Sequence, residues 1–282
     1  MSGSEAVAGV VRVVVIVVIV VFAAFPLLYA IGLSLRSFAD VAADPLAILP
    51  GTFDLSAYST ALRGRGEGGF DLLRFMVNSF VLSALTTLAT LVVCVLGAYA
   101  TARLRFRGRG AVGALFLSVY VLPGIALAVP LYVLFSRLGL RGSLVGLVII
   151  YMATTVPLAI YMLRNYFESV PVSVEEAGAI DGAGRMQIIG RIVLPMTMPG
   201  IAATGLYIFM IAWNEYLYAL LFLIDDRERW TVSLGVSQLA QFDVPVTVLM
   251  AGSIAITVPV LIGFFAAQRA MVSGLTAGAE KG

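Results

Sequence analysis

Long apolar stretches alternate with short charged segments along the chain. Six stretches hold at most one charged residue each, and they occupy residues 13–35, 75–102, 110–136, 142–163, 198–224 and 246–268. About 20 consecutive apolar residues let an α-helix cross the hydrocarbon core of a bilayer, so each stretch is long enough. Backbone groups cannot stay unpaired in lipid, and these stretches are too continuously apolar for barrel strands. The pattern predicts an all-α, polytopic membrane protein with six transmembrane helices.

The first stretch could also be a secretory signal. Its apolar run exceeds the usual length of about 7 to 15 residues, and no clear small-x-small cleavage site follows, so we interpret it as the first span. No polar stretch is long enough for a soluble domain. Residues 1–282 are therefore predicted to form a single transmembrane domain.

The distribution of arginines predicts the orientation. An even number of spans places both termini on one side, and short cytoplasmic loops are enriched in basic residues. The turn between the second and third predicted spans, "RLRFRGRG" at residues 103–110, contains four arginines. We therefore expect both termini to be cytoplasmic. The segment 169–196 would then face the cytoplasm, and the loops 37–73 and 225–245 would be external.

The composition excludes several kinds of chemistry. The chain is 61% hydrophobic and 12% charged, and it contains no histidine. With Cys94 as the only cysteine, histidine/cysteine metal sites, histidine-based triads and an intrachain disulfide are excluded. Lys281 is the only lysine, so the chain lacks a phosphate-binding G-x-x-x-x-G-K-[ST] loop. We expect no catalytic residue, bound metal, cofactor or nucleic acid, and any uphill transport must draw energy from a partner subunit or an ion gradient.

The polar segment 169–200 lies between the fourth and fifth predicted spans. Pro171 ends the preceding helix, and Ser173 with Glu176 three residues later predicts a capping box and a short helix from about residue 174. Gly182 is suited to a turn, after which apolar residues recur at helical spacing in 185–195. The segment thus predicts a helix, a turn and a second helix at the membrane surface. It would either anchor the bundle as an interfacial helix or dock a cytoplasmic protein.

The spacing in this segment resembles the cytoplasmic coupling motif of permease subunits in binding-protein-dependent ABC importers. The motif E-A-A, three residues, G, nine residues, I-x-L-P corresponds here to Glu176, Ala177, Gly178, Gly182, Ile192, Leu194 and Pro195. Gly178 stands where the family has alanine, a change that loosens a helix by up to about 1 kcal/mol. The stretches "YMLRNYFESVP", "AWNEYLYALLFL" and "QRAMVSGLTAGAEKG" are similar to the smaller inner-membrane subunit of maltose-type and multiple-sugar importers. The resemblance covers essentially the whole chain.

The resemblance implies a type I ABC importer permease for sugars in the bacterial inner membrane. Its partners would be a second permease in a heterodimer, two cytoplasmic ATP-binding subunits that hold ATP and Mg²⁺, and an external substrate-binding protein. In the family, the motif helix sits in a cleft of the ATPase. Glu175, Glu176 and Asp181 are suited to pair with basic groups there. The loop 225–243 would reach into the sugar pocket of the binding protein, and the tail from Gln268 to Gly282 would lie against the ATPases.

A second candidate site surrounds an acidic residue in the fifth predicted span. Aromatic rings beside amides and carboxylates bind sugars, so Asn214, Glu215, Tyr216 and Tyr218 form a possible substrate path. A hydrogen-bonded structural acid in an aromatic belt would have the same composition. Three alternatives remain open: an importer of polyamines or peptides, an ion-coupled secondary transporter with Glu215 as proton carrier, and a membrane scaffold.

Overall fold

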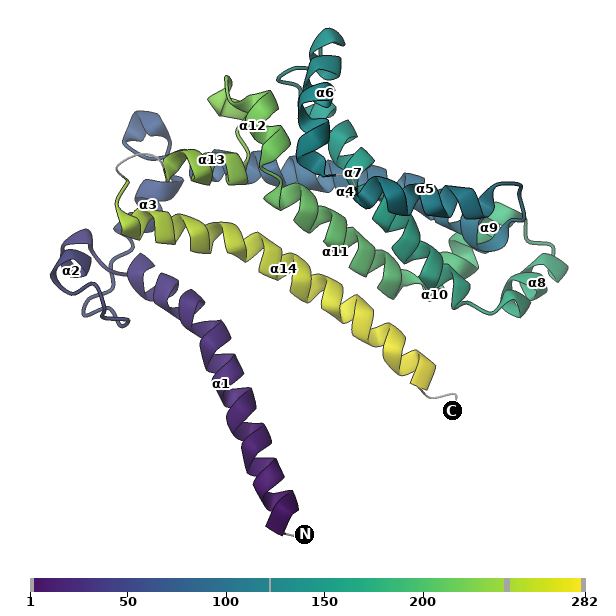
Figure 1. Ribbon diagram of the computed structural model, residues 1–282, viewed down its shortest axis with the longest axis horizontal. Coiled ribbons are helices and arrows are strands. Elements are labelled where there is room, and N and C mark those ends of the chain that lie inside the picture. The colour runs from purple at the N-terminus through teal and green to yellow at the C-terminus, as the bar shows by residue number, and fades with distance from the viewer. Residues whose placement is uncertain (1–2, 122, 241–243, 280–282) are drawn as a thin grey trace. The chain divides into compact units, whose positions relative to one another are not determined.

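Every regular element is helical in the described part of the chain. The computed structural model describes residues 3–121, 123–240 and 244–279. The helices are α1 (Gly3–Ser34), α2 (Phe38–Ala43), α3 (Ser56–Leu62), η1 (Arg65–Glu67), α4 (Leu72–Arg103), α5 (Arg109–Val121), α6 (Gly124–Arg137), α7 (Leu144–Glu168), α8 (Val172–Ile180), α9 (Arg185–Ile188), the π-helix η2 (Ile189–Val193), α10 (Leu194–Met196), α11 (Met198–Asn214), α12 (Leu217–Leu223), η3 (Arg227–Arg229), α13 (Val232–Leu239) and α14 (Val246–Ala279) (Figure 1). The predicted all-α class is confirmed.

Four described helical segments are long and apolar enough to cross a membrane: Gly9–Ser34, Leu72–Arg103, Leu144–Glu168 and Val246–Gln268. A fifth candidate is the pair Arg185–Met196 and Met198–Asn214, which is bent by 80°. The six-span count stays a prediction, because two of the predicted spans are each divided into two helices.

The divided spans break at identifiable residues. The third predicted span consists of α5 and α6, and α6 begins directly after Pro123, which has no backbone N–H to donate. The fifth consists of α11 and α12, which are separated by the extended backbone of Glu215 and by Tyr216. Part of the predicted external loop 225–245 and the end of the predicted tail, with Lys281, lie outside the described residues.

The chain forms two compact units. Unit 1 comprises the described parts of residues 1–74 and 236–258. Within it, α1 exposes apolar side chains on all sides between Val10 and Phe22, as suits a helix surrounded by lipid. Arg36 is 4% exposed and donates to three backbone carbonyls of residues 40–47 at 2.7, 2.7 and 2.8 Å. This arginine therefore folds the predicted external loop back onto itself.

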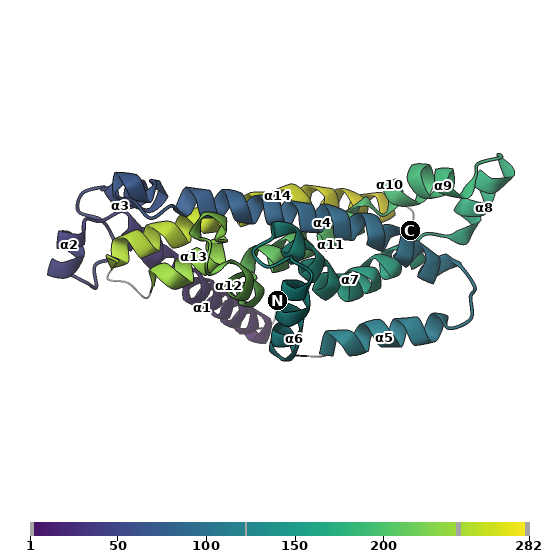
Figure 2. The same cartoon turned by 90° about the horizontal axis from the view of Figure 1, so that it is seen from above.

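Unit 2 comprises the described parts of residues 75–235 and 259–282. In this unit α7 packs against both α5 and α11. A buried core joins α4, α7, α9, η2 and α11, and it contains Cys94, Ala98, Tyr99, Ala102, Ala159, Ile160, Leu163, Phe167, Ile188, Ile189, Val193 and Ile208. The helices α8 and α9 lie at the end of the unit where α4 and α7 finish (Figure 2). The polar segment is thus built onto the same core as the apolar helices.

Candidate coupling site

The first arm of the polar segment is the nine-residue helix α8. Its N-cap is Pro171, and no side chain caps it, so the predicted Ser173–Glu176 capping box is wrong. The helix begins two residues earlier than that box requires, which places Ser173 inside the first turn, where it cannot act as the N-cap. Ser173 and Glu176 are both exposed.

The predicted turn at Gly182 is confirmed. Gly182 has φ +84°, a left-handed conformation that side chains disfavour. Its N–H donates to Ala179 O at 3.1 Å, and the N–H of Ala183 donates to Gly178 O at 3.0 Å. These two bonds satisfy carbonyls at the end of α8 in the arrangement of a Schellman motif. The turn therefore has a defined geometry that redirects the chain into α9.

The second arm is not a regular α-helix. It runs through α9, the π-helix η2 and α10, and the wide turn precedes Pro195, which cannot donate to the carbonyl four residues earlier. Ile189 and Val193 are buried as the apolar spacing predicts, whereas Met186 is 67% exposed. The expected apolar face therefore begins after Met186, and it fixes this arm in the core of unit 2.

Gly178 permits close packing of the two arms. A Cβ built at this residue would lie 2.6 Å from Cδ1 of Ile192. Because that atom is the end of a flexible side chain, an alanine here would require the isoleucine to move. The glycine that departs from the family pattern therefore lies at the contact between α8 and η2.

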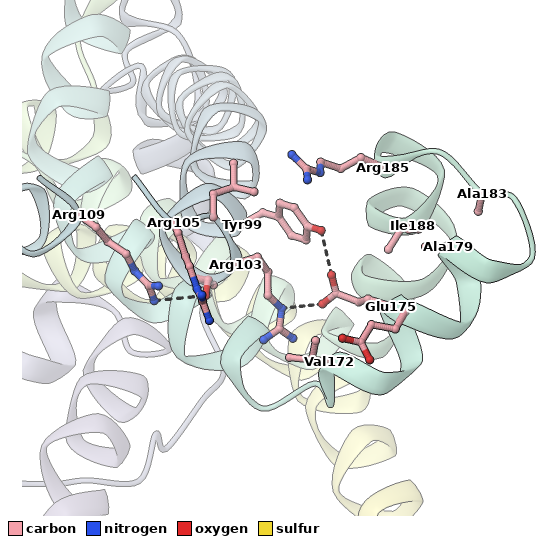
Figure 3. A pocket seen from close by; sticks show the side chains of 13 residues that line it. Tyr99, Arg103, Arg105, Arg109, Val172, Glu175, Ala179, Ala183, Arg185 and Ile188 are labelled. Atoms are coloured by element: carbon pink, nitrogen blue, oxygen red, sulfur yellow. Dashed lines mark hydrogen bonds and ion pairs between the residues drawn. The ribbon is translucent and has the colours of Figure 1, made fainter. Parts of the chain in front are cut away.

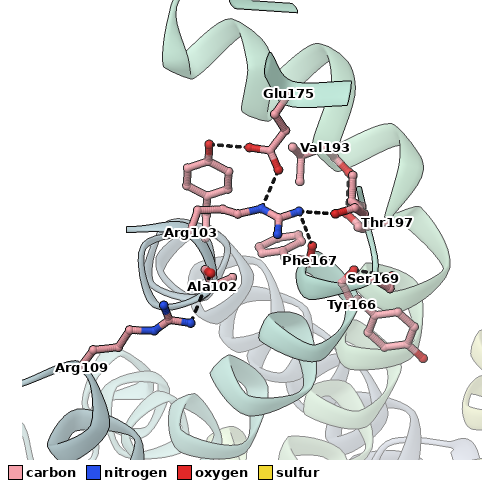
Figure 4. Close-up of polar contacts among 11 residues, drawn as sticks. Ala102, Arg103, Arg109, Tyr166, Phe167, Ser169, Glu175, Val193 and Thr197 are labelled. Carbon is pink, nitrogen blue, oxygen red and sulfur yellow. Dashed lines mark hydrogen bonds and ion pairs between the residues drawn. The ribbon is translucent and has the colours of Figure 1, made fainter. Parts of the chain in front are cut away.

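Glu175 is buried and bound by two side chains of α4. Its Oε1 accepts from Arg103 Nε at 2.6 Å (Figure 4). Its Oε2 accepts from Tyr99 Oη at 2.9 Å. The Arg103 and Glu175 side chains are only 12% and 10% exposed. Removing one partner of a buried ion pair typically costs about 3–5 kcal/mol. Both oxygens of Glu175 have partners on α4, and a pairing of Glu175 with an ATPase stays a prediction.

Arg103 also joins the end of α7 to this cluster. Its Nη2 donates to the carbonyl oxygens of Phe167 at 2.8 Å and Val170 at 2.5 Å. The Tyr99 ring packs edge-on against the Phe167 ring, with centroids 6.4 Å apart. Sequence reasoning treated Arg103 only as a charge that sets orientation. The signal that it missed is a tyrosine and an arginine four residues apart at the end of a long apolar helix.

A cavity of about 610 Å³ lies between the end of α4 and the arms of the polar segment (Figure 3). Glu176, Ala179 and Arg185 are among its lining residues and are exposed. Ala177, Asp181 and Pro195 are exposed as well, while Ile192 and Leu194 are half-buried. Glu176 in α8 and Asp181 at its C-cap are therefore exposed acids that are accessible to a partner.

At the second candidate site, the acidic side chain accepts three hydrogen bonds. The Glu215 carboxylate accepts from Tyr151 Oη at 2.7 Å and from the backbone N–H groups of Tyr218 and Ala219 at 2.9 and 3.1 Å. The last two bonds satisfy the first turn of α12, which starts after the break at residues 215–216. Glu215 therefore has a structural role that needs no ligand.

The other three residues of this candidate site differ in their contacts and exposure. Asn214 is exposed and donates to Met210 O in its own helix at 2.8 Å. Tyr218 is buried, and its hydroxyl donates to Gly124 O at 3.2 Å, whereas Tyr216 is half-buried. The structure thus brings Glu215 and Tyr218 together and directs Asn214 to its own backbone. A substrate path at these residues stays a prediction.

We expect Glu215→Ala to destabilise the chain, because it leaves the Tyr151 hydroxyl and two helix N–H groups without their acceptor. Each unsatisfied buried donor costs about 1–3 kcal/mol. The thermal midpoint of the detergent-solubilised protein should fall clearly, with Asn214→Ala as the control that should change it little. Equal midpoints for the two variants would contradict the structural role of this carboxylate.

The predicted external loop begins with a packed segment. Trp230 is 7% exposed and lies against Phe75 at the start of α4, with ring centroids 5.7 Å apart. The Asn78 amide donates to Glu228 O at 2.7 Å and to Trp230 O at 3.0 Å. Residues 228–230 are therefore attached to α4.

Known proteins are similar to this chain over most of its length. The profile of the family described as "Binding-protein-dependent transport system inner membrane component" matches residues 93–276. The inner membrane ABC transporter permease protein YcjP of Escherichia coli K12 is 38% identical over 216 residues, which cover 76% of each chain. The trehalose/maltose transport system permease protein MalG of Thermococcus litoralis is 33% identical over 260 residues, covering 92% of this chain and 91% of that protein.

A solved structure shows the same fold. One chain of a bacterial ABC transporter involved in the import of the acidic polysaccharide alginate matches with a TM-score of 0.82 and 25% identity, covering 95% of this chain and 98% of that chain. The family profile spans more than half of the sequence and includes the polar segment with α8. The chain is therefore a multi-pass inner membrane protein that belongs to the family of inner membrane components of binding-protein-dependent transport systems.

Proposed function

We propose that this chain is the permease subunit of an ATP-driven sugar uptake system. It forms half of the translocation pathway and is coupled to a cytoplasmic ATPase through residues 173–195. The observation that carries the proposal is the geometry of α8, a short helix with a closed Gly182 turn, a buried anchor at Glu175 and an exposed Glu176. A compact, firmly attached helix transmits displacement better than a flexible loop. The motif would therefore transmit displacement from the ATPase to the permease.

The proposal includes the partners that such a subunit needs. These are a second permease in a heterodimer, two cytoplasmic subunits that bind ATP and Mg²⁺, and an external substrate-binding protein. The orientation follows from the arginines of residues 103–110, which would keep that turn in the cytoplasm. The contact between Arg103 and Glu175 supports placing α8 on the same side. Both termini would then be cytoplasmic, with residues 37–73 and 225–245 outside.

Sugar is the favoured class of substrate because a relative 33% identical over most of both chains is named for trehalose and maltose. Polyamines and peptides are the alternatives within the importer class. The test is binding of the external substrate-binding protein to a panel of trehalose, maltose, alginate oligosaccharides, spermidine and a short peptide. Retention of a carbohydrate is expected, and retention of spermidine or the peptide alone would contradict the substrate class.

The source of energy separates the proposed importer from an ion-coupled transporter. Uptake into vesicles that contain the assembled complex should require ATP and should persist when an ionophore collapses the proton gradient. The complex purified through this chain should also contain a second permease and an ATPase. Uptake that fails on collapse of the gradient and needs no ATP would favour a transporter that uses Glu215. A chain that purifies alone and transports nothing would favour a scaffold.

A further inference from the structure

The helix α8 is attached to the rest of unit 2 in four ways. Residues 169–171 connect it to α7, and the Gly182 turn connects it to α9. Its side facing η2 is in contact through Gly178 and Ile192. The Glu175 carboxylate supplies the fourth attachment, which is made directly to side chains of α4.

Two side chains of α4 bind the Glu175 carboxylate. Tyr99 and Arg103 are four residues apart, so they lie on the same face of α4 in adjacent turns. Each binds a different oxygen of Glu175, at 2.9 and 2.6 Å. Two bonds to one carboxylate fix its orientation as well as its position. A rotation of α8 therefore cannot occur without breaking one bond or moving the end of α4.

The same guanidinium fixes the end of α7. Arg103 binds the carbonyl oxygens of Phe167 and Val170, which flank the end of that helix and the link to α8. The group is largely shielded from water, which strengthens its electrostatic contacts. One side chain thus joins the last turn of α4, the end of α7 and the first turn of α8.

The neighbouring ion pairs differ in both exposure and connectivity. Arg109 of α5 and Arg164 of α7 both pair with Glu168 of α7, and these side chains are 33% to 39% exposed. The first pair joins α5 to α7, the second lies within α7, and neither includes a residue of α8. Charge pairs of this exposure contribute little to stability. Arg109 also donates to the carbonyl oxygen of Ala102 in the last turn of α4 at 3.3 Å. Arg164 is therefore the better control, since its pair with Glu168 lies near the same end of the unit and within α7.

We propose that Arg103 and Tyr99 are positioning residues for energy coupling. Through Glu175 they make the end of α4 move with α8, so that displacement imposed on α8 by the ATPase enters the bundle at α4 as well as through the chain connections. The proposal rests on the function proposed above and assigns to it two residues outside the coupling motif. The group formed by Tyr99, Arg103 and Glu175 is called the α4 clamp below.

The test measures sugar uptake per ATP hydrolysed, with the complete complex reconstituted in vesicles. The sugar is the one that the binding protein retains from trehalose, maltose and alginate oligosaccharides. Glu175→Gln removes the ion pair at nearly constant shape, and Tyr99→Phe removes one bond while keeping the ring on Phe167. Arg164→Ala is the control, because its ion pair lies within α7. A bifunctional thiol reagent joining cysteines placed at 103 and 175 tests whether a covalent link replaces the clamp.

Both clamp variants should retain the ATPase and continue to hydrolyse ATP, while uptake per ATP falls. Coupling energies between sites usually correspond to changes of about 5- to 150-fold, so we expect at least a 5-fold fall for Glu175→Gln and a smaller one for Tyr99→Phe. Arg164→Ala should match the wild type. Cross-linking of the double-cysteine variant should restore most of the ratio, and single-cysteine variants treated in the same way should not recover.

Three results would overturn the clamp. The ratio could equal that of the wild type in both variants, uptake and hydrolysis could fall together in proportion to complex lost, or the cross-link could fail to restore coupling. Normal coupling by the wild type in the same experiment would leave the proposed function intact in each case. Absence of ATP-driven uptake by the wild-type complex would instead overturn the proposed function, and the clamp with it.

Discussion

Replacing Gly182 with valine is expected to lower ATP-driven uptake by at least about 10-fold, within the range of typical coupling energies. Valine cannot adopt φ +84° without strain, and the left-handed conformation costs an L-residue about 1–2 kcal/mol. The chain can relieve that strain by opening the turn, which releases the two bonds that end α8 and changes its direction. No atom outside the turn lies within 4 Å of a Cβ at this position, so the bundle itself should stay folded.

The measurement is uptake and ATP hydrolysis by reconstituted complex, together with the amount of chain inserted in the membrane. Gly184→Val is the matched control, since Gly184 lies two residues later in the same turn and has φ −71°. We expect the control to retain most of the uptake. A Gly182→Val complex that transports normally would show that the defined turn is not needed for coupling.

Replacing Gly200 with leucine is expected to impair folding. A Cβ at Gly200 would lie 2.1 Å from Cγ of Tyr166, inside the contact between α11 and α7. Overpacking of a tight interface costs about 1–3 kcal/mol, and more where the backbone must move. We therefore expect less folded chain in the membrane and a lower thermal midpoint in detergent.

Two further variants test the origin of that effect. Gly190→Leu introduces the same side chain where a Cβ meets nothing within 4 Å, so it should leave the midpoint nearly unchanged. Adding Tyr166→Ala to Gly200→Leu should recover part of the lost stability, because the ring is the group that the leucine displaces. If Gly200→Leu is as stable as Gly190→Leu, the close approach of α7 and α11 at this residue is not required for the fold.

The apolar pattern predicts the all-α class because lipid allows few ways to satisfy the backbone. It does not predict where a span is divided. Pro123 interrupts the third apolar stretch, and Glu215 with Tyr216 interrupts the fifth, without lowering the apolar character of either stretch enough to end it. Hydropathy measures the composition of a stretch, whereas the continuity of a helix depends on single backbone and capping groups.

The coupling motif is visible in the sequence because its residues are close together. The turn at Gly182 follows from local rules, since glycine tolerates the left-handed conformation that ends α8. The anchor does not follow, because Arg103 and Glu175 are 72 residues apart and no local spacing relates them. Glu175 and Glu176 are indistinguishable by residue type. Only the packing of α8 against α4 shows that the first is buried and the second exposed.

The most direct test of the coupling role is photo-cross-linking in intact cells from an unnatural residue placed at position 176. Glu176 is exposed on α8, so its replacement should leave the fold intact. The control position is Asp226 in the predicted external loop. A cross-link from position 176 to an ATP-hydrolysing subunit, with none from position 226, is the expected result. Cross-links from position 176 only to lipid, or to a protein outside the cell membrane, would contradict a cytoplasmic coupling helix.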